Sequence, residues 1–542
     1  MTLPKLAKDF IKSQSEQIGE LLGLLSKKDE ELSNTRKALE EAEAEIRRLK
    51  KLPKRPKLQA SQLDEESNAG LDEKKTGKEQ EKKTRRNGKK GKQGKIEIHE
   101  TKEVKIAQVP LGWNLVGYRS YVIQDMIVRA NNIEYKRELW RSPDGKSQLL
   151  ASLPAHLQGK QLGMNLRAYV LQQYYECGVT QNLIWQSLQD FGVQISTGQI
   201  NSILNDDNEL FHAEKIGLLK KAIELREELR TDDTGARHQF KNAYCNCINS
   251  NLFTYFETTF SKSRINFLEI LRQDYSAYVL NQSAVDYMKK EGLGLKYLEV
   301  LEAELSNQVR HFRDKEALSI YLKDQGFVVQ NAVKTITEGL LIGTLAAYSF
   351  SLDTLIHSDG AGQFNVFIHS LCWKHAERPL VKLRCYNDTQ EQLLGETKAA
   401  YWQLYQDLKT FKQDPQKTKI KALEQQFEDL CKPVINFSSL NQVLEQLKKK
   451  KDHLLRVLKY PQISLHNNDS ERDIREYVKR RKISAGTRSE NGRKARDTFL
   501  SLKKTCRKLG VSFWDFLIDR LHRSHQIPML YDIMQVRKLA MN

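Results

Sequence analysis

ELRTDDTGARHQFKNAYCNCINSNLFTYFETTF (residues 228–260) predicts three consecutive β-strands with turns between them. We expect the first of these strands to end in the DDTG sequence at 232–235. A carboxylate on a central strand of a basic protein is unusual, because a buried charge requires a partner or a metal ion. The two aspartates of this sequence, Asp232 and Asp233, are therefore the first candidates for chemistry.

Two later stretches each supply a further acidic candidate. LDTLIHSDGAGQFN (352–365) is an apolar, strand-like run that ends at Asp359 and Gly360. A helical stretch separates it from LHNNDSERDIREYVKRRK (465–482). Residues three and four apart lie on one face of a helix, and four polar residues of this stretch have that spacing: Asn468, Glu471, Arg472 and Arg475.

Two aspartates at strand ends and one glutamate on a helix can converge to hold two divalent metal ions. Hard cations such as magnesium prefer oxygen ligands of this kind. Two metal ions a few ångströms apart activate an attacking oxygen and stabilise a leaving oxygen at phosphorus. Each acid alone is explained as well by capping, turn formation or a surface salt bridge. The prediction therefore depends on the combination of Asp232, Asp359 and Glu471.

At these residues the sequence resembles the signature blocks of DDE-type bacterial insertion-sequence transposases, and most closely those of insertion-sequence family sixty-six. The similar blocks are DDTG (232–235), SDGAGQFN (358–365) followed by LCWKHAER (371–378), and HNNDSERDIR (466–475). The tail at 481–521 is similar to the basic loop and closing helices of that family. The resemblance covers residues 161–521, and the block around Glu471 is its most specific part.

The resemblance implies an α/β catalytic core of the ribonuclease H-like type, preceded by a helix-turn-helix and a coiled coil. The family's first catalytic aspartate falls on Asp232, with Asp233 as an alternative, the second on Asp359 and the glutamate on Glu471. These residues would share the coordination of Mg²⁺ or Mn²⁺, with two ions in each active site. Water would cleave DNA at the element's terminal repeats, and the released 3′-hydroxyl would then attack target DNA. Accessory proteins of the element are further possible partners.

Two other functions fit the same residues. A non-catalytic regulator derived from a transposase would bind DNA without cutting it. The presence of all three acids with their basic neighbours argues against this alternative. A two-metal nuclease of the same fold would cut DNA without joining it. Strand-joining assays separate the nuclease from the transposase, because the fold and the metal chemistry are shared.

Composition, residue patterns and the resemblance together predict six segments, and the ribonuclease H-like nature of the catalytic domain is what the resemblance implies. The segments are a coiled coil (1–52), a disordered basic linker (53–95), a small β-rich module without zinc-binding cysteines (96–150), a helical, helix-turn-helix-like DNA-binding domain (151–227), a ribonuclease H-like catalytic domain (228–485) with a helical insertion at 261–350, and a basic loop with C-terminal helices (486–542).

The N-terminal segments indicate self-association and contact with phosphate. Apolar residues recur every seven positions from Ile11 to Ile46, which favours a coiled coil between protomers over a lone amphipathic helix. The linker ends in KKTRRNGKKGKQGK (82–95), with eight Lys or Arg in fourteen residues. Such a polycation suits phosphate contacts without sequence recognition, although a merely solubilising linker would look the same.

The secondary structure of the segments before the catalytic domain is predicted from the spacing of their apolar residues. Alternation in 96–140 predicts strands of an antiparallel module, and the absence of cysteine from 96–160 excludes the zinc-binding stretch often found in the family. Three short helices follow, and Ser196 or Thr197 is expected to cap the third. Gln199 and Asn201 on that helix are candidates to contact base edges.

Many Arg and Lys residues flank Glu471 in the sequence, and we call them the basic belt. Such a group of positive charges is explained by contact with the phosphate backbone of DNA. The belt comprises Arg472, Arg475, Lys479, Arg480, Arg481, Lys482, Arg488, Arg493 and Lys494. Cys372 and His375 share a face of a predicted helix, but two ligands do not complete a zinc site. We therefore expect Cys372 to pack in the core, and His375 to pack or to approach DNA beside the active site.

Composition agrees with a DNA-binding function. The 542 residues include 88 Lys or Arg against 69 Asp or Glu, a formal net charge of +19 that requires an anionic partner such as nucleic acid. Seven cysteines without a dense framework of disulfide spacings argue for a reducing compartment.

The N-terminus lacks the apolar core of a signal peptide, and the longest apolar run, 340–352, is too short to span a bilayer. We expect a cytoplasmic protein with no membrane partner, associated with the nucleoid when bound to DNA.

Overall fold

The computed structural model describes residues 97–108, 111, 113–153, 159, 161–348 and 350–541, together with Lys28. The predicted coiled coil and the predicted basic linker therefore lie outside the described residues, apart from Lys28. All the other described residues belong to one structural unit, Thr76–Asn542. Among the helices of this described part, none combines the length and the hydropathy needed to cross a lipid bilayer.

Within the described part of 96–150, a single hairpin is present, formed by β1 (Leu139–Arg141) and β2 (Gln148–Leu150). The prediction of a β-rich module is corrected for the remainder, because residues 97–108 and 113–138 form neither helix nor strand. Alternation produces a stable strand only where a partner strand and a covering layer are present. Most apolar side chains of this segment are instead exposed.

Five helical elements follow the hairpin and form a bundle. They are α3 (Met164–Leu171), the π-helical turn η2 (Gln172–Glu176), α4 (Gln181–Asp190), α5 (Thr197–Asn205) and α6 (Glu209–Glu224). The predicted cap of the third helix is confirmed for Ser196, whose Oγ accepts a hydrogen bond from the Gln199 backbone N–H at 3.2 Å. The Gln199 Oε1 accepts one from the Ser196 N–H at 2.9 Å, which completes a capping box.

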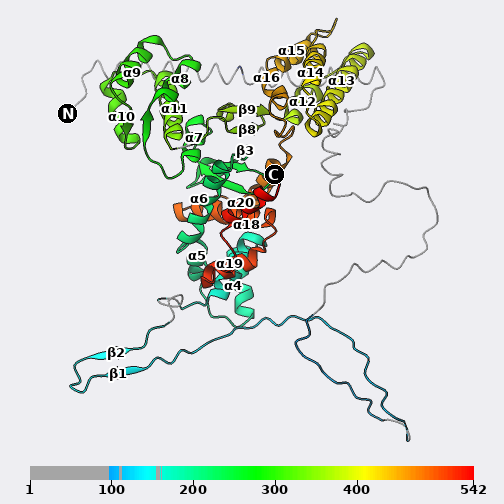
Figure 1. The fold of residues 1–542 in the computed structure, drawn as a ribbon. Helices are drawn as coiled ribbons and strands as arrows, with labels where there is room; N and C mark the ends of the chain where they lie inside the picture. The colour runs from blue at the N-terminus through cyan, green and yellow to red at the C-terminus, as the bar shows by residue number, and fades with distance from the viewer. Residues whose placement is uncertain are drawn as a thin grey trace. The chain divides into compact units, whose positions relative to one another are not determined.

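A five-stranded mixed sheet with the order β5-β4-β3-β8-β9 forms the centre of the described chain (Figure 1). Its strands are β3 (Leu229–His238), β4 (Lys241–Asn249), β5 (Thr254–Thr259), β8 (Leu355–Ser358) and β9 (Ile368–Leu371). β3, β4 and β5 pair antiparallel, whereas β8 and β9 run parallel to β3. The three consecutive strands predicted for 228–260 are confirmed, but β3 extends beyond Gly235 because β4 pairs with it as far as His238.

The segment between β5 and β8 is helical, as predicted for 261–350, and it also contains a small antiparallel sheet of β6 and β7. Its elements are α7 (Arg264–Arg272), β6 (Tyr278–Leu280), α8 (Gln282–Lys290), α9 (Leu295–Asn307), β7 (Arg310–Phe312), α10 (Lys315–Asp324) and α11 (Gln330–Ala347). A Cβ atom at Gly343 would lie 2.1 Å from the Val279 carbonyl oxygen, so glycine allows α11 to pack directly on β6.

A second helical segment lies between β9 and the helix that carries Glu471, where the sequence predicted a helical stretch. It contains α12 (Trp373–Val381), α13 (Asp388–Gln413), α14 (Lys417–Leu430), α15 (Ser438–Lys448), α16 (Lys451–Leu454) and the short η4 (Leu455–Leu458), and it leads into α17 (Asn468–Ser484). Its core is built around the fully buried Trp373, whose ring contacts Tyr401 and Phe427.

The C-terminal helices pack on the helical bundle that precedes the sheet. They are α18 (Glu490–Lys508), α19 (Phe513–His522) and α20 (Leu530–Met541). α18 lies on β5 and α6, α19 on α3, and α20 on α6 (Figure 1). Arg520 of α19 donates from Nε and NH2 to the carboxylate of Glu214 in α6 at 2.7 and 2.9 Å, and both side chains are buried. Segments predicted as separate domains therefore share one packed core.

Candidate active site

Asp232 lies within β3, on the face of the sheet that α17 covers. The antiparallel register places Asp232 opposite Cys247 of β4, and directly opposite residues share a face of the sheet. Cys247 is fully buried in a cluster that includes Ile474 and Tyr477 of α17. The Asp232 carboxylate, which is half-buried, therefore points toward the helix that carries the third acid.

Asp233 follows Asp232 on the strand and so points to the opposite face of the sheet. Its carboxylate forms an ion pair with Lys262 and accepts a hydrogen bond from Gln363 Nε2. Its backbone N–H donates to Asp232 Oδ1 at 2.8 Å. Asp233 thus has its own partners, and its backbone helps to orient Asp232.

Asp359 is carried by the turn that follows β8. The Ser358 hydroxyl accepts the Gly360 N–H at 3.1 Å and contacts His369 Nε2 at 2.8 Å, which fixes the start of the turn to β9. The Asp359 carboxylate accepts the Ala361 N–H at 3.0 Å. Gly360 has a φ of +98°, a conformation that L side chains rarely adopt. The SDGAG sequence therefore specifies the turn that presents Asp359.

Glu471 lies in the first turn of α17, and the residues just before it fasten that turn to the sheet. Asn467 Nδ2 donates to the carbonyl oxygen of Thr231, the residue before Asp232, at 2.9 Å. The Asn467 backbone N–H donates to Cys372 Sγ at 3.2 Å. These contacts place Glu471 beside β3, and they give a structural role to the polar run HNND that precedes the glutamate.

Asp473 anchors the same helix from its buried side. Its carboxylate accepts hydrogen bonds from Asn249 Nδ2 at 2.9 Å and from Thr254 Oγ1 at 2.6 Å. Lys504 and Lys508 of α18 form ion pairs with it at 2.9 and 2.6 Å. Burial disfavours the charged carboxylate, yet the two lysines hold the pKa of Asp473 below its usual value. Sequence reasoning did not assign this role, although Asp473 belongs to the quoted motif.

The three predicted acids converge closely enough for their charges to interact. Burial raises the pKa of Asp232 to about 7, and the negative charges of Asp359, Asp233 and Glu471 contribute to the rise. Asp232 and Glu471 are separated by 239 positions in the sequence, and the fold brings them together through β3 and α17. A concentration of like charge with a perturbed pKa is a recognised mark of a functional site.

Two arginines and a histidine surround Glu471. His375 Nε2 and Arg378 NH2 each lie 3.6 Å from Glu471 Oε1, and Arg475 NH2 lies 3.9 Å from Oε2. No hydrogen bond reaches Oε1, which is buried. Burial, and then the charge of Arg378, lowers the pKa of His375. The glutamate therefore lies among basic side chains, and its Oε1 atom could accept a hydrogen bond or bind a cation.

The chemistry of the acids fits a hard divalent cation. As the side chains stand, no three His, Cys, Asp or Glu residues in the described part of the chain form a group that could hold a metal ion. The donors are nevertheless carboxylates of the kind that Mg²⁺ prefers, and one of their oxygens is buried without a hydrogen-bond partner. Burial is the main cause of the raised pKa of Asp232, and a dication would relieve the repulsion between carboxylates that adds to it. The residues that fit are Asp232, Asp359 and Glu471.

Cys372 and His375 occupy different environments. Cys372 precedes α12 and is buried, which raises the pKa of its thiol to about 11. Its sulfur accepts the hydrogen bond from Asn467. His375 instead lies beside Glu471. Cys372 is thus buried in the core, and His375 contacts the third candidate acid.

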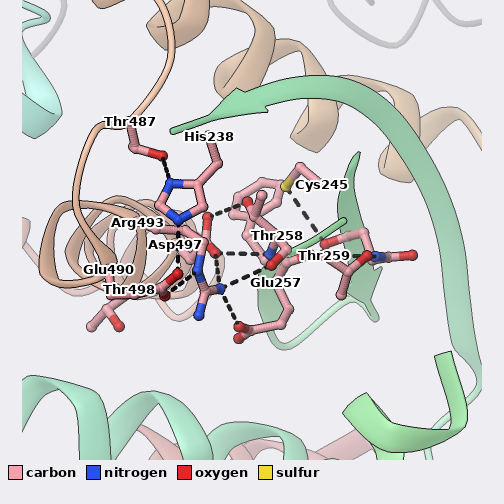
Figure 2. A network of polar contacts seen from close by, with 12 residues as sticks. His238, Cys245, Glu257, Thr258, Thr259, Thr487, Glu490, Arg493, Asp497 and Thr498 are labelled. Carbon is pink, nitrogen blue, oxygen red and sulfur yellow. Dashed lines mark hydrogen bonds and ion pairs between the residues drawn. The ribbon is translucent and has the colours of Figure 1, made fainter. Parts of the chain in front are cut away.

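The predicted basic belt divides into exposed and internal residues. Six of its side chains belong to exposed residues: Arg472, Arg475, Lys479, Lys482, Arg488 and Lys494. Arg481 is half-buried and donates to the Gly235 carbonyl. Arg480 is buried, where it donates to the Tyr174 carbonyl at 2.7 Å and lies over the Tyr174 ring. Arg493 pairs with Glu257, Glu490 and Asp497 inside the fold (Figure 2). The structure therefore corrects the assignment of Arg480 and Arg493, which make internal contacts.

Gln199 and Asn201, the candidates for base contacts, lie at the start and middle of α5. The Gln199 side chain is engaged in the capping box, and Asn201 Oδ1 accepts from Asn205 Nδ2 at 2.8 Å. An open pocket of about 510 Å³ lies between α4 and α5. Its lining includes Trp185, Gln189 and Gln199. This part of the bundle thus offers polar side chains at a surface hollow.

Comparison with known proteins gives two matches. The model of the Transposase IS66 family matches residues 343–495, a range that includes Asp359 and Glu471 but not Asp232. An uncharacterized protein of Sinorhizobium fredii (strain NBRC 101917 / NGR234), y4jO, is 40% identical over 296 residues, which cover 54% of this chain and 91% of that protein. No solved structure gives a significant match.

Proposed function

Because the chain belongs to the IS66 family of transposases, we propose that it is a DDE-type transposase that cuts DNA at the ends of its element and joins them to target DNA. The observation that carries the proposal is the convergence of Asp232, Asp359 and Glu471, whose charges contribute to an Asp232 pKa of about 7. Three acids from distant stretches, meeting in a basic protein, suit metal-assisted transfer at phosphorus.

The sheet supports this proposal. Three antiparallel strands followed by two strands parallel to the first are compatible with the ribonuclease H-like core that the resemblance implies. The first acid lies on the central strand β3, the second follows its parallel neighbour β8, and the third lies on α17, which packs on β3 and β4. The acids therefore sit where adjacent elements of one core meet.

In the proposed reaction, Asp232, Asp359 and Glu471 would hold two Mg²⁺ or Mn²⁺ ions, which polarise the attacking oxygen and stabilise charge at phosphorus when bound. Asp233 orients Asp232 through its backbone N–H. Arg378 and Arg475, which approach Glu471, are placed to contact phosphate oxygens of DNA. These side chains would position the DNA without forming a covalent intermediate with it.

The two proposed steps are balanced displacements at phosphorus. In the first, water forms a new P–O bond and the bond from phosphorus to the 3′-oxygen breaks, which leaves a free 3′-hydroxyl. In the second, that 3′-hydroxyl attacks a target phosphodiester and displaces another 3′-oxygen. Each step exchanges one P–O bond for another, so neither requires an external energy source.

DNA contacts would come from the exposed part of the belt and from the helical bundle. The exposed belt residues carry positive charge on α17, on the loop that follows it and in the first turns of α18, and cationic side chains bind the phosphate backbone. We further propose that α4 and α5 act as a helix-turn-helix, with the pocket between them facing the element's end. Self-association through residues 1–52, and contact with accessory proteins of the element, complete the proposed assembly.

The proposal is tested with labelled DNA that carries the ends of the encoding element. Cleavage and strand joining are measured with Mg²⁺ for the wild type and for Asp232→Asn, Asp359→Asn and Glu471→Gln, with Asp233→Asn as the matched control. We expect both activities to fall at least about 1,000-fold in the three acid variants while DNA binding persists, because preorganised charge stabilisation is the largest catalytic contribution. Asp233→Asn should retain measurable joining.

Other outcomes would assign another function. Cleavage without joining on correct ends would identify a nuclease, and specific binding without cleavage under Mg²⁺ or Mn²⁺ would identify a regulator. Loss of activity in Asp233→Asn with retention in Asp232→Asn would transfer the first catalytic role to Asp233.

A further inference from the structure

The turn between β3 and β4 has an unfavourable sequence for its shape. β3 ends at His238 and β4 begins at Lys241, so Gln239 and Phe240 form a two-residue loop. Their φ angles are +48° and +62°. Hairpin turns with two positive φ angles strongly prefer Asn-Gly or Asp-Gly, because bulkier side chains are strained there. The preference for a favourable turn therefore does not explain the phenylalanine at this position. Residues with a strained backbone of this kind are found more often at functional sites.

Phe240 does not contribute to the core. Its side chain is 79% exposed at the end of the sheet. A second phenylalanine, Phe260, follows β5 and is 53% exposed. The guanidinium of Arg488 lies 5.9 Å from the centre of the Phe240 ring. An exposed aromatic ring beside an arginine is a common arrangement where proteins bind nucleic-acid bases.

The loop after α17 is fixed to this turn. The Gln239 N–H donates to the Thr487 carbonyl at 2.8 Å, and the Thr487 N–H donates to the Arg237 carbonyl at 3.0 Å. The buried ring of His238 contacts the Thr487 hydroxyl through Nδ1 and Glu490 through Nε2, each at 2.8 Å, as Figure 2 shows. These bonds hold the basic loop and the hairpin turn together as one surface.

The charge of this surface is positive. Its exposed cationic residues are Arg237 and Lys241 at the turn and Arg488 in the loop. The acidic residue Glu490, which contacts His238 beside the turn, is paired with both His238 and Arg493. The surface therefore combines cations suited to phosphates with an aromatic ring suited to a base.

The surface is separate from the proposed catalytic acids. His238 lies six positions after Asp232 on β3, which places the turn about 20 Å from Asp232 at roughly 3.3 Å per residue. That distance corresponds to about six nucleotides of a DNA strand at roughly 3.4 Å each. The turn can therefore contact the same DNA molecule as the acids without touching the bond that is cut.

We propose that this surface binds an unpaired base of DNA, which stacks on Phe240 while Arg237, Lys241 and Arg488 contact the adjoining phosphates. This inference rests on the proposed function, because it assigns the DNA structure that the protein recognises beside the cut. The strained turn holds the Phe240 ring away from the core, where a base that has left the duplex can reach it. Stacking on an aromatic ring accepts any base, so the contact would depend on unpaired structure and not on sequence.

The test compares two fluorescein-labelled duplexes of the same end sequence, one fully paired and one with a short run of unpaired thymines. Binding is measured by anisotropy at fixed salt for the full-length wild type, Phe240→Ala, Phe240→Leu and Phe240→Trp. We expect the wild type to prefer the duplex with unpaired bases. Phe240→Ala and Phe240→Leu should lose about 5- to 100-fold in affinity for it and bind the paired duplex normally, because one stacked base contributes that much. Phe240→Trp should retain the preference.

A second readout follows the base itself. 2-Aminopurine in the unpaired run should be quenched by the wild type and by Phe240→Trp, but not by Phe240→Leu. Tyr386→Ala, which removes another exposed aromatic side chain, is the control and should behave as the wild type. Equal preference and equal quenching in the wild type and Phe240→Leu would overturn the inference.

The outcomes separate this inference from the proposed function. Asp232→Asn should abolish cleavage yet keep the preference for unpaired DNA. A wild type that cuts and joins DNA, with Phe240→Leu unchanged in both binding readouts, would refute the role of Phe240 alone. A wild type that neither binds nor cuts DNA would refute the proposed function and the inference with it.

Discussion

At the scale of single residues, the position of Asp359 depends on Gly360. A Cβ atom there would lie 3.0 Å from Leu371 Cδ2, and the φ of +98° disfavours any L side chain. We predict that Gly360→Ala lowers the single-turnover cleavage rate at least about 10-fold, because misplacing a catalytic group by about 1 Å costs up to 100-fold. Gly362→Ala is the matched control, since no atom lies within 4 Å of its Cβ position. Equal rates for the two variants would show that the turn does not position Asp359.

Buried histidines make the fold sensitive to acid. Burial, followed by the charges of His453 and Arg456, lowers the pKa of His369 from the usual histidine value of 6.5 to about 3. A lowered histidine pKa means that the unfolded chain binds the proton more tightly, so stability is present above pH 6.5 and is lost as the pH falls toward 3.

We therefore predict that His369→Gln makes the free energy of unfolding less dependent on pH below 6.5. His369 should account for about 2 kcal/mol of the wild-type loss between pH 7 and pH 5. Urea unfolding at several pH values measures this dependence, and His311→Gln, at an exposed position, is the control. A wild-type slope preserved in His369→Gln would rule out this role of the histidine.

At the residue level, the sequence was sufficient to select candidate acids, but it did not reveal which side chains contact one another in the fold. Asp232, Asp359 and Glu471 could be selected because acids in three ordered motifs are a local signal. The contact of Asn467 with the Thr231 carbonyl could not be predicted, since the two residues are 236 positions apart. For the same reason Arg480 was assigned to DNA, although the Tyr174 carbonyl is its partner in the fold.

At the scale of elements, α17 is held against the sheet and α18 by one buried carboxylate. Removing one partner of a buried ion pair leaves the other charge uncompensated, and burial already lowers the pKa of Lys508. We predict that Asp473→Asn lowers the free energy of unfolding by about 3–5 kcal/mol. Glu299→Gln, on the exposed side of α9, should change it by less than about 0.5 kcal/mol. Indistinguishable urea midpoints for the two variants would mean that Asp473 does not anchor α17.

Helices and strands were predicted well where the spacing of apolar residues coincides with side chains that are buried in the core. The three strands of 228–260 and the helices of 164–205 follow the expected pattern, and both groups contribute to the buried core. The alternation in the described residues 97–108 and 113–138 had the period of a strand, but most of their apolar side chains are exposed and no strand forms among them. The alternation of apolar and polar residues is a local property of the sequence, whereas a β-strand also requires a second strand, from elsewhere in the chain, to pair with.

At the scale of the whole molecule, the C-terminal helices pack against helices that precede the sheet in the sequence. The C-terminal helices α19 and α20 pack on α3 and α6, and the buried pair of Arg520 with Glu214 joins residues 306 positions apart. The sequence indicated helices at both ends of this region but not their contact, because no local pattern encodes which helices share a core. The central sheet, which brings the three acids together, lies between these packed segments in the sequence.

The central claim is that three distant stretches form one site for divalent cations. Fe²⁺ with ascorbate, used in place of Mg²⁺, generates radicals that cut the backbone only near the bound ion, and fragment masses locate the cuts. We predict cuts near residues 232, 359 and 471 in the same preparation, suppressed by excess Mg²⁺ and absent from Asp232→Asn. Cuts at one of these stretches alone, or at positions unrelated to all three, would contradict the claim.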